Sequence, residues 1–124
     1  MRLLLDAHAL VWWLSGSERL GERARDAITD ETNDAVVGIG TIWELAIKRS
    51  LQKLHFPYDF EAVLSDEGFQ VLPISLAHLR VLDSLPLHHR DPFDRLLIAQ
   101  SLAERIPIIT GDRAFAGYSV AIVW

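Results

Sequence analysis

Five short apolar runs, separated by stretches with helical spacing, constrain the fold of this 124-residue chain more than any other feature. The runs are continuous rather than alternating, which is typical of strands buried on both faces. Alternation of such strands with helices predicts βαβ units, and therefore an α/β fold whose parallel sheet carries helices on both faces. The strand-like runs are residues 2–6, 35–39, 69–74, 107–110 and 119–124, and the helical stretches are 7–14, 18–29, 41–51, 59–65, 76–84 and 92–105.

Composition narrows the class of protein further. Half of the residues are apolar, which fits one folded domain spanning residues 1–124. The absence of cysteine excludes disulfides, zinc–thiolate sites and thiol catalysis. No apolar stretch approaches the length of a membrane span, so we expect a cytoplasmic protein without a membrane partner. The net charge of −5 argues against a simple nucleic-acid-binding module, but it is compatible with a nuclease whose carboxylates hold cations.

Acidic side chains follow the predicted strands or begin the next helix at four places, Asp6, Glu44, Asp94 and Asp112. In an open parallel sheet the carboxyl ends of the strands share one edge, and ligands bind in the crevice there. Carboxylates gathered within a few ångströms repel each other unless a cation holds them, and such hard oxygens suit Mg²⁺ or Mn²⁺. The sequence therefore predicts a divalent-metal site, for which phosphodiester hydrolysis is the commonest use.

The segment HHRDPFDR contains two aspartates with different predicted roles. Asp91 precedes Pro92, and proline favours the first helical position, so we interpret Asp91 as the helix N-cap. Asp94 then falls in the first turn, beside the strand ends, where it is a candidate metal ligand. His88 and His89 are adjacent on an irregular segment, which makes a zinc site unlikely, although either ring could orient a phosphate or order the loop.

Glu44 and Asp112 each have a structural alternative to metal binding. Glu44 could form an exposed ion pair with Lys48, four residues later on the same helix. The segment TIWELAIK is apolar nearly all round, however, which favours a buried Glu44 and places Trp43 in the core or at an interface. Asp112 could cap a short helix or stabilise a turn.

The order of these acids and their local sequences resembles the PIN-domain ribonucleases, and within them the VapC-type toxins of type II toxin–antitoxin pairs. The resemblance runs from end to end, and HHRDPFDRLLIAQ is its most specific part. A glycine often stands in such sequences at the position of Gln52. The matching segments are LLLDAHALVWWL, TIWELAIKRSLQKL, LPLHHRDPFDRLLIAQSLAE, IITGDRAF and the terminal tryptophan.

This resemblance implies a three-layer αβα sandwich with a central, mostly parallel sheet of four to five strands. It also implies an endoribonuclease whose acidic quartet binds one or two Mg²⁺ or Mn²⁺ ions. The expected partners are an RNA substrate, a second copy of the chain in a homodimer, and a cognate antitoxin whose C-terminal segment lies across the active site. The quartet would be Asp6, Glu44, Asp94 and Asp112.

Two other functions are compatible with parts of the sequence. A phosphotransfer domain, either receiver-like or phosphatase-like, also places aspartates at strand ends. The phosphatase pattern requires a second aspartate two residues after the first, where this chain has His8. The second alternative is a catalytically silent α/β interaction module, in which the four acids serve as caps and surface ion pairs.

Overall fold

The computed structural model describes residues 1–124 and contains one five-stranded sheet in which every neighbouring pair of strands is parallel. The order across the sheet is β3-β2-β1-β4-β5, so the first strand lies at the centre. This confirms the predicted α/β class and the parallel sheet. The strands are β1 (Arg2–Leu5), β2 (Asp34–Gly38), β3 (Gln70–Leu72), β4 (Ile108–Ile109) and β5 (Ile122–Val123).

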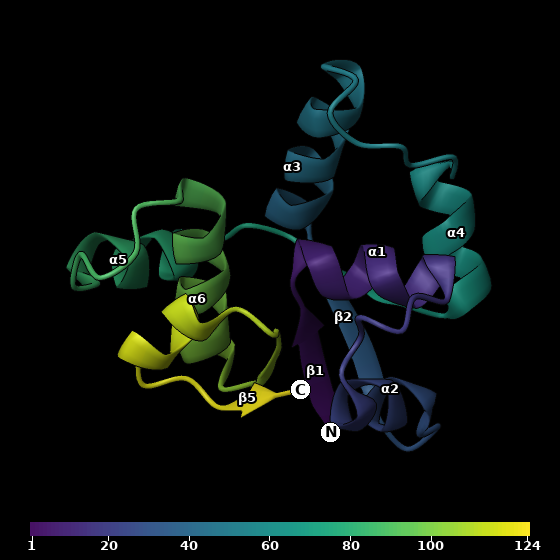
Figure 1. Cartoon of the computed structure of the whole chain (residues 1–124). Coiled ribbons are helices and arrows are strands. Elements are labelled where there is room, and N and C mark those ends of the chain that lie inside the picture. The colour runs from purple at the N-terminus through teal and green to yellow at the C-terminus, as the bar shows by residue number, and fades with distance from the viewer.

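Six α-helices and a short 3-10 helix connect the strands and cover the sheet (Figure 1). All five predicted strands and all six predicted helices are present, although every strand except β2 is shorter than its apolar run. No helix has the length and hydropathy needed to cross a membrane. The helices are α1 (Ala7–Ser15), α2 (Glu22–Thr29), α3 (Ile39–Ser50), α4 (Phe60–Glu67), α5 (Leu76–Ser84), α6 (Pro92–Glu104) and the 3-10 helix η1 (Arg113–Gly117).

Successive residues of β1 face opposite sides of the sheet, and this alternation divides the core into two clusters. Leu3 and Leu5 pack with apolar side chains of α1, α2, α3 and α4. Leu4 faces the other way and packs with α6 and with Phe115 of η1. Figure 1 shows α5 and α6 on one side of the strands, and α1, α2 and α4 on the other. The chain is therefore a three-layer αβα sandwich.

The strand order creates a crevice between β1 and β4. From β1 the chain continues to β2, toward one edge of the sheet. From β4 it continues to β5, toward the opposite edge. Such a reversal opens a crevice at the carboxyl ends of the two strands, where ligands of open α/β sheets bind. The backbone N–H of Asp6 donates to the carbonyl oxygen of Ile109 at 3.1 Å, which fixes the end of β1 against the end of β4.

Two features of α3 and of the turn after it differ from a simple apolar helix. Trp43 is 58% exposed and contacts Phe93 edge-to-face, so of the two predicted positions the core is excluded and an interface stays a prediction. Gln52, just after the helix, has a φ of 57°, in the left-handed region that glycine adopts most easily. This conformation explains why glycine suits the position in similar sequences.

The C-terminal Trp124 packs over Gly111, in the segment that follows β4. A Cβ atom on Gly111 would lie 2.5 Å from Cε2 of Trp124, closer than side chains approach in proteins. Gly21 lies equally close to the same residue, because a Cβ atom there would lie 2.6 Å from the carbonyl carbon of Trp124. The two glycines therefore let the indole lie against the backbone at the edge of the crevice.

We expect Gly111→Ala to destabilise the protein by about 1–3 kcal/mol, the usual cost of overpacking, because the new methyl group displaces the Trp124 indole. The same substitution in a Trp124→Ala background should cost much less, since the clash is then absent. Thermal unfolding of the wild type, the two single variants and the double variant measures this coupling. Additive effects would show that the indole does not set the size of residue 111.

Candidate functional site

Asp6 lies at the carboxyl end of β1 and caps helix α1. Its Oδ1 accepts a hydrogen bond from the backbone N–H of Ala9 at 2.7 Å. The side chain satisfies one of the free amides of the first helical turn in this way, which is the usual role of an aspartate N-cap. Asp6 is only 5% exposed, so its carboxylate is held at the crevice and largely out of water.

Glu44 lies on α3 and is 9% exposed, as the apolar surroundings of TIWELAIK predicted. Its Oε2 atom pairs with the ammonium group of Lys48 at 2.8 Å, so the ion pair foreseen as the structural alternative is present. The lysine side chain is 42% exposed whereas the glutamate side chain is 12% exposed. Lys48 therefore reaches in from solvent, and the pair offsets part of the cost of burying Glu44.

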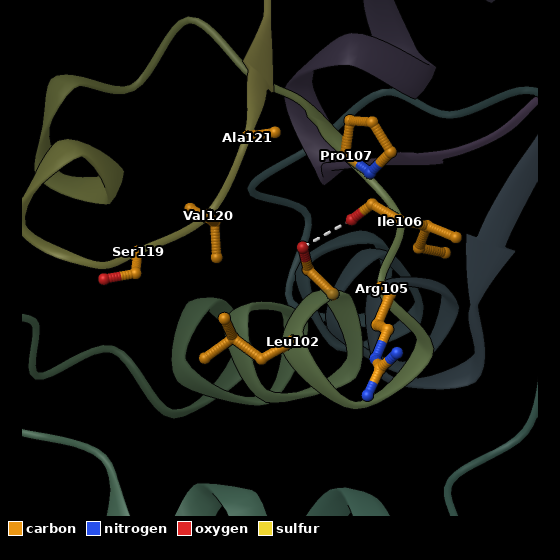
Figure 2. Close-up of a pocket in the computed structure, with 8 residues that line it drawn as sticks. Leu102, Arg105, Ile106, Pro107, Ser119, Val120 and Ala121 are labelled. Atoms are coloured by element: carbon orange, nitrogen blue, oxygen red, sulfur yellow. Dashed lines mark hydrogen bonds between the residues drawn. The ribbon is translucent and has the colours of Figure 1, made fainter.

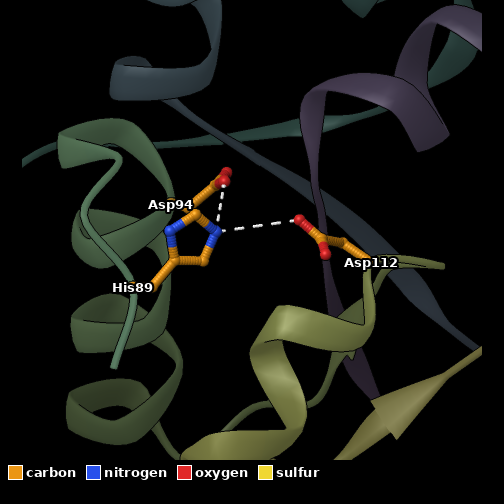
Figure 3. Close-up of side chains that lie close together, drawn as sticks. All are labelled: His89, Asp94 and Asp112. Atoms are coloured by element: carbon orange, nitrogen blue, oxygen red, sulfur yellow. Dashed lines mark ion pairs between the residues drawn. The ribbon is translucent and has the colours of Figure 1, made fainter. Parts of the chain in front are cut away.

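Helix α6 begins with two aspartates that face different partners. Oδ1 of Asp91 accepts hydrogen bonds from the backbone N–H groups of Phe93 at 2.8 Å and Asp94 at 3.0 Å. The predicted N-cap role of Asp91 is thus confirmed. Because Asp91 satisfies these amides, the Asp94 carboxylate is not needed as a cap, and it points toward His89 and Asp112 (Figure 3).

Asp112 follows β4 and caps the 3-10 helix η1. Its Oδ1 accepts from the backbone N–H of Ala114 at 2.9 Å, and its own N–H donates to the hydroxyl oxygen of Thr110 at 3.0 Å. Its Oδ2 remains free of these bonds and faces His89. Asp112 therefore has the capping role foreseen as its structural alternative, and it still presents one oxygen to the crevice.

His89 lies between Asp94 and Asp112, a position that the sequence did not reveal. Figure 3 shows both carboxylates directed at its imidazole. Nε2 lies 3.0 Å from Oδ2 of Asp94 and 3.7 Å from Oδ2 of Asp112. It is nevertheless a buried nitrogen without a hydrogen-bond partner, because the Asp94 oxygen is poorly aligned with it and the Asp112 oxygen lies beyond hydrogen-bond distance. An unpaired buried polar atom of this kind is uncommon and often marks a functional site.

The opposite nitrogen of the ring determines what His89 offers the crevice. Nδ1 accepts a hydrogen bond from the backbone N–H of Asp91 at 3.2 Å. A neutral imidazole has one donor and one acceptor nitrogen, so its proton is then on Nε2. While the bond to Asp91 is made, His89 presents an N–H group to the crevice rather than a lone pair for a metal.

The acids of the crevice act on one another electrostatically. Burial raises the pKa of Asp94 to about 7, and the negative charge of Asp91 adds to this rise. The charges of Glu44 and Asp6 raise the pKa of Asp94 further, whereas His89 lowers it. Three other acids thus act on Asp94, two of them members of the predicted quartet.

Asp6 has a raised pKa for the same main reason. Burial is the largest cause, and the side chain of Thr110 and the amide of Ala9 oppose it by hydrogen bonding to the carboxylate. The charge of Asp112 raises the pKa of Asp6 as well. Carboxylate oxygens of Asp94 and Asp112 lie within 4.8 Å of each other, whereas Asp6 and Glu44 lie outside that group and act on it through their charges. Their role as metal ligands stays a prediction.

The donor atoms at this crevice suit a hard divalent cation. Asp6, Glu44, Asp94 and Asp112 come from separate elements. The helix caps of Asp6 and Asp112 and the Lys48 pair of Glu44 each engage one carboxylate oxygen. Carboxylate oxygens of Asp94 and Asp112 lie within 4.8 Å of each other, close enough for one ion, with Nε2 of His89 equally near. Oxygen donors favour Mg²⁺ or Mn²⁺ over softer metals, and a cation there would relieve the repulsion among the acids.

A second hollow, of about 320 Å³, lies between α6 and the segment before β5 and lacks such chemistry (Figure 2). Its lining includes four apolar residues and a single charged side chain, Arg105. The hydroxyl of Ser101 is the buried group there that could act as a nucleophile, but it donates to the carbonyl oxygen of Ile106 at 2.5 Å. The acidic crevice is therefore the better candidate for an active site.

Comparison with known proteins identifies the family and the fold of the chain. The sequence pattern of the PIN domain family matches residues 3–120. A comparison with curated proteins finds no match. Among solved structures, VapBC2 from Rickettsia felis bound to a DNA fragment from its promoter superposes with a TM-score of 0.69 at 12% identity, over 98% of this chain and 97% of that chain.

Two further solved structures share the fold at similarly low identity. A toxin–antitoxin complex from Klebsiella pneumoniae gives a TM-score of 0.68 at 18% identity, over 98% of this chain and 96% of that chain. FitAcB from Neisseria gonorrhoeae gives 0.65 at 17% identity, over 97% and 95%. The likeness to these structures is one of fold.

We expect Asp94→Asn to raise the Tm of the metal-free protein, and to raise it more at pH 8 than at pH 5. The folded protein holds the Asp94 proton more tightly than the unfolded chain, because the pKa rises from 3.8 to about 7. The contribution of Asp94 to the free energy of unfolding is therefore greatest below about pH 4, and it is lost as the pH rises through 7. Asparagine carries no charge to repel the neighbouring acids at pH 8.

Thermal unfolding in EDTA at the two pH values measures this difference. Asp83→Asn provides a matched control, since Asp83 is exposed on α5 and should show no pH-dependent gain. An equal gain for Asp94→Asn at both pH values would contradict the electrostatic interpretation of the crevice.

Proposed function

Because this chain belongs to the PIN domain family, we propose that it is a Mg²⁺- or Mn²⁺-dependent endoribonuclease that hydrolyses RNA phosphodiester bonds. Asp6, Glu44, Asp94 and Asp112 would be the ligands of the metal. The convergence of these acids on one crevice carries the proposal, because burial and neighbouring charges together raise the pKa of Asp94 to about 7. Ionisable groups perturbed in this way cluster at functional sites.

The chemistry of the proposed reaction follows from the charge of the site. A divalent ion bound there would activate a water for in-line attack on the phosphodiester and stabilise the departing oxygen. The four carboxylates account for four of the negative charges, and bound divalent ions would neutralise them. A chain of net charge −5 can therefore act on RNA. With the ligands neutralised, positive side chains such as Arg113 beside Asp112 can approach the phosphates.

The residues around the ligands have separate tasks in this proposal. Asp91 caps α6 and so leaves Asp94 free to face the crevice. Lys48 holds Glu44 in place through the 2.8 Å ion pair. The Nε2–H of His89 lies between Asp94 and Asp112 and is positioned to donate to a phosphate oxygen of the substrate. None of these three tasks requires the residue to bind the metal.

The two alternative functions account for less of the structure. Receiver-type phosphotransfer domains have the strand order 2-1-3-4-5, whereas this sheet has the order β3-β2-β1-β4-β5. A silent interaction module would give the acids only capping and pairing roles. That account does not explain why acids that repel one another lie close together, or why the Nε2 atom of His89 has no hydrogen-bond partner.

We further propose that the nuclease is the toxin of a toxin–antitoxin pair, acting in the cytoplasm as a homodimer. The likeness of its fold to VapBC2 and FitAcB supports this assignment. Exposed apolar side chains provide surface for such partners. They include Trp43 at 58%, Leu76 at 73%, Leu79 at 43% and Leu87 at 69% exposure. An antitoxin segment lying across the crevice would hinder the approach of RNA.

Cleavage of structured RNA and tRNA by the purified protein, stripped of any partner, tests the nuclease. Activity should require Mg²⁺ or Mn²⁺ and vanish in EDTA. Asp6→Asn and Asp94→Asn should each lower the rate by at least roughly 100-fold, because even the loss of an outer partner of a metal ligand costs 10–100-fold. Asp91→Asn should keep much of the activity, since asparagine caps a helix as well as aspartate does.

A loss of cleavage in Asp91→Asn as severe as in Asp94→Asn would show that the two aspartates have been assigned the wrong roles. Circular dichroism of each variant provides the control for folding. Metal-independent cleavage that survives in Asp6→Asn and Asp94→Asn would contradict the proposed site altogether.

Metal binding should also appear in stability, independently of any RNA. We expect saturating Mg²⁺ or Mn²⁺ to raise the Tm of the wild type at pH 8, because a ligand that binds only the folded state stabilises it by about 2.7 kcal/mol at 100 times its Kd. Asp94→Asn should shift far less. The absence of any shift in the wild type would favour the silent interaction module.

A further inference from the structure

A cavity of about 450 Å³ opens beside Asp6 and Asp112, and His89 is not among the residues that line it. Its volume falls within the range of about 300–1,000 Å³ that is usual for small-molecule sites. It combines two acids of the quartet with three aromatic rings and one arginine. The lining residues are Asp6, His8, Trp12, Arg19, Gly111, Asp112 and Trp124.

The aromatic part of the cavity is rigid. Trp124 lies against Gly111 so closely that even a Cβ atom on the glycine would lie 2.5 Å from the indole. Trp12 packs against Trp124 with ring centroids 5.8 Å apart, and Trp12 is half-buried on α1. The two indoles therefore support each other, and their position relative to the carboxylates is fixed by the sheet and by α1.

His8 extends this aromatic wall toward solvent. Its ring stacks on Trp12 at a centroid distance of 5.2 Å, with the two planes only 14° apart. His8 is exposed, so the face of the imidazole that does not contact Trp12 is open. An exposed flat ring backed by a second ring is a platform on which a nucleobase can stack.

Arg19 supplies a positive charge at the same cavity. It lies between α1 and α2, it is exposed, and its guanidinium makes no ion pair or hydrogen bond within the chain. An arginine free of internal partners keeps all five donors of its planar group, which match a phosphate. The cavity therefore holds a base platform and a phosphate donor beside two of the proposed metal ligands.

We propose that this cavity is a subsite for one nucleotide of single-stranded RNA, next to the bond that is cut. The nucleobase stacks on His8, backed by Trp12, and Arg19 binds the phosphate of the same strand. This inference rests on the proposed function for its placement beside the scissile bond. A single strand is required, because the faces of bases in a duplex are already covered by their neighbours.

Binding of a fluorescein-labelled hexanucleotide RNA, followed by anisotropy in EDTA, tests the subsite without cleavage. The protein carries Asp94→Asn so that the substrate stays intact. His8→Ala should weaken binding roughly 5- to 100-fold, the effect of losing one stacked base, whereas His8→Phe should stay within about twofold. Both substitutions remove the imidazole nitrogens, so their difference isolates the stacking surface.

Arg19 is tested by the salt dependence of the same binding. Arg19→Ala should lower the slope of log K against log salt by about 0.7, the value for one phosphate contact on a single strand. Arg23→Ala is the matched control, because Arg23 is exposed on α2 outside the cavity and its loss changes the charge equally. It should leave affinity and slope unchanged within error.

The outcomes separate this inference from the nuclease proposal. Equal affinity of His8→Ala and His8→Phe, together with an unchanged slope in Arg19→Ala, would overturn the subsite even if the wild type cleaves RNA. If the His8 and Arg19 variants bind RNA as expected but the wild type cleaves no RNA, the RNA-binding subsite is supported and the nuclease proposal is contradicted. Equal weakening by Arg19→Ala and Arg23→Ala would also overturn the subsite, since it would indicate general attraction of RNA to a positive surface.

Discussion

Repulsion between buried carboxylates is the interaction on which the rest of the crevice depends. Burial and the charges of Asp91, Glu44 and Asp6 oppose the ionisation of Asp94. The fold tolerates this repulsion because Asp6, Glu44 and Asp94 belong to separate elements that the sheet and its helices fix in position. Burying like charges together weakens folding, and the proposed cation would offset that cost by neutralising them. The local ion pair of Lys48 and the N–H of His89 reduce the repulsion without removing it.

The acids of the crevice combine two tasks within one side chain. Asp6 and Asp112 each use one oxygen to cap the helix that follows. The cap fixes the carboxylate relative to the backbone, so the second oxygen is held in a defined direction. On α6 the two tasks are divided between neighbours, because Asp91 caps the helix and Asp94 faces the crevice. Capping thus orients potential ligands as well as ending helices.

The sequence predicted the layers of the fold and the positions of the acids, because both depend on local pattern. Continuous apolar runs identified β1 and β2, and strand topology then placed Asp6 beside Asp112. The sequence did not reveal that His89 turns toward Asp94, since that contact depends on the path of an irregular loop. Nor did it reveal the exposure of Trp43, because an apolar residue on a helix indicates burial without saying whether a partner covers it. The fit of Trp124 over Gly111 also depends on long-range packing.

The central position of β1 has a consequence for the time at which the crevice forms during synthesis. Leu4 and Leu5 of β1 pair with Ile108 and Ile109 of β4, about a hundred residues later in the chain. A domain folds as a unit during synthesis, and this pairing must wait until residues 108 and 109 have been made. A nascent chain that has formed β1, β2 and β3 already contains Asp6 and Glu44, yet it lacks Asp112 and the wall formed by Trp124. The complete crevice therefore forms only after β4, Asp112 and Trp124 have been synthesised, well after β1, β2 and β3.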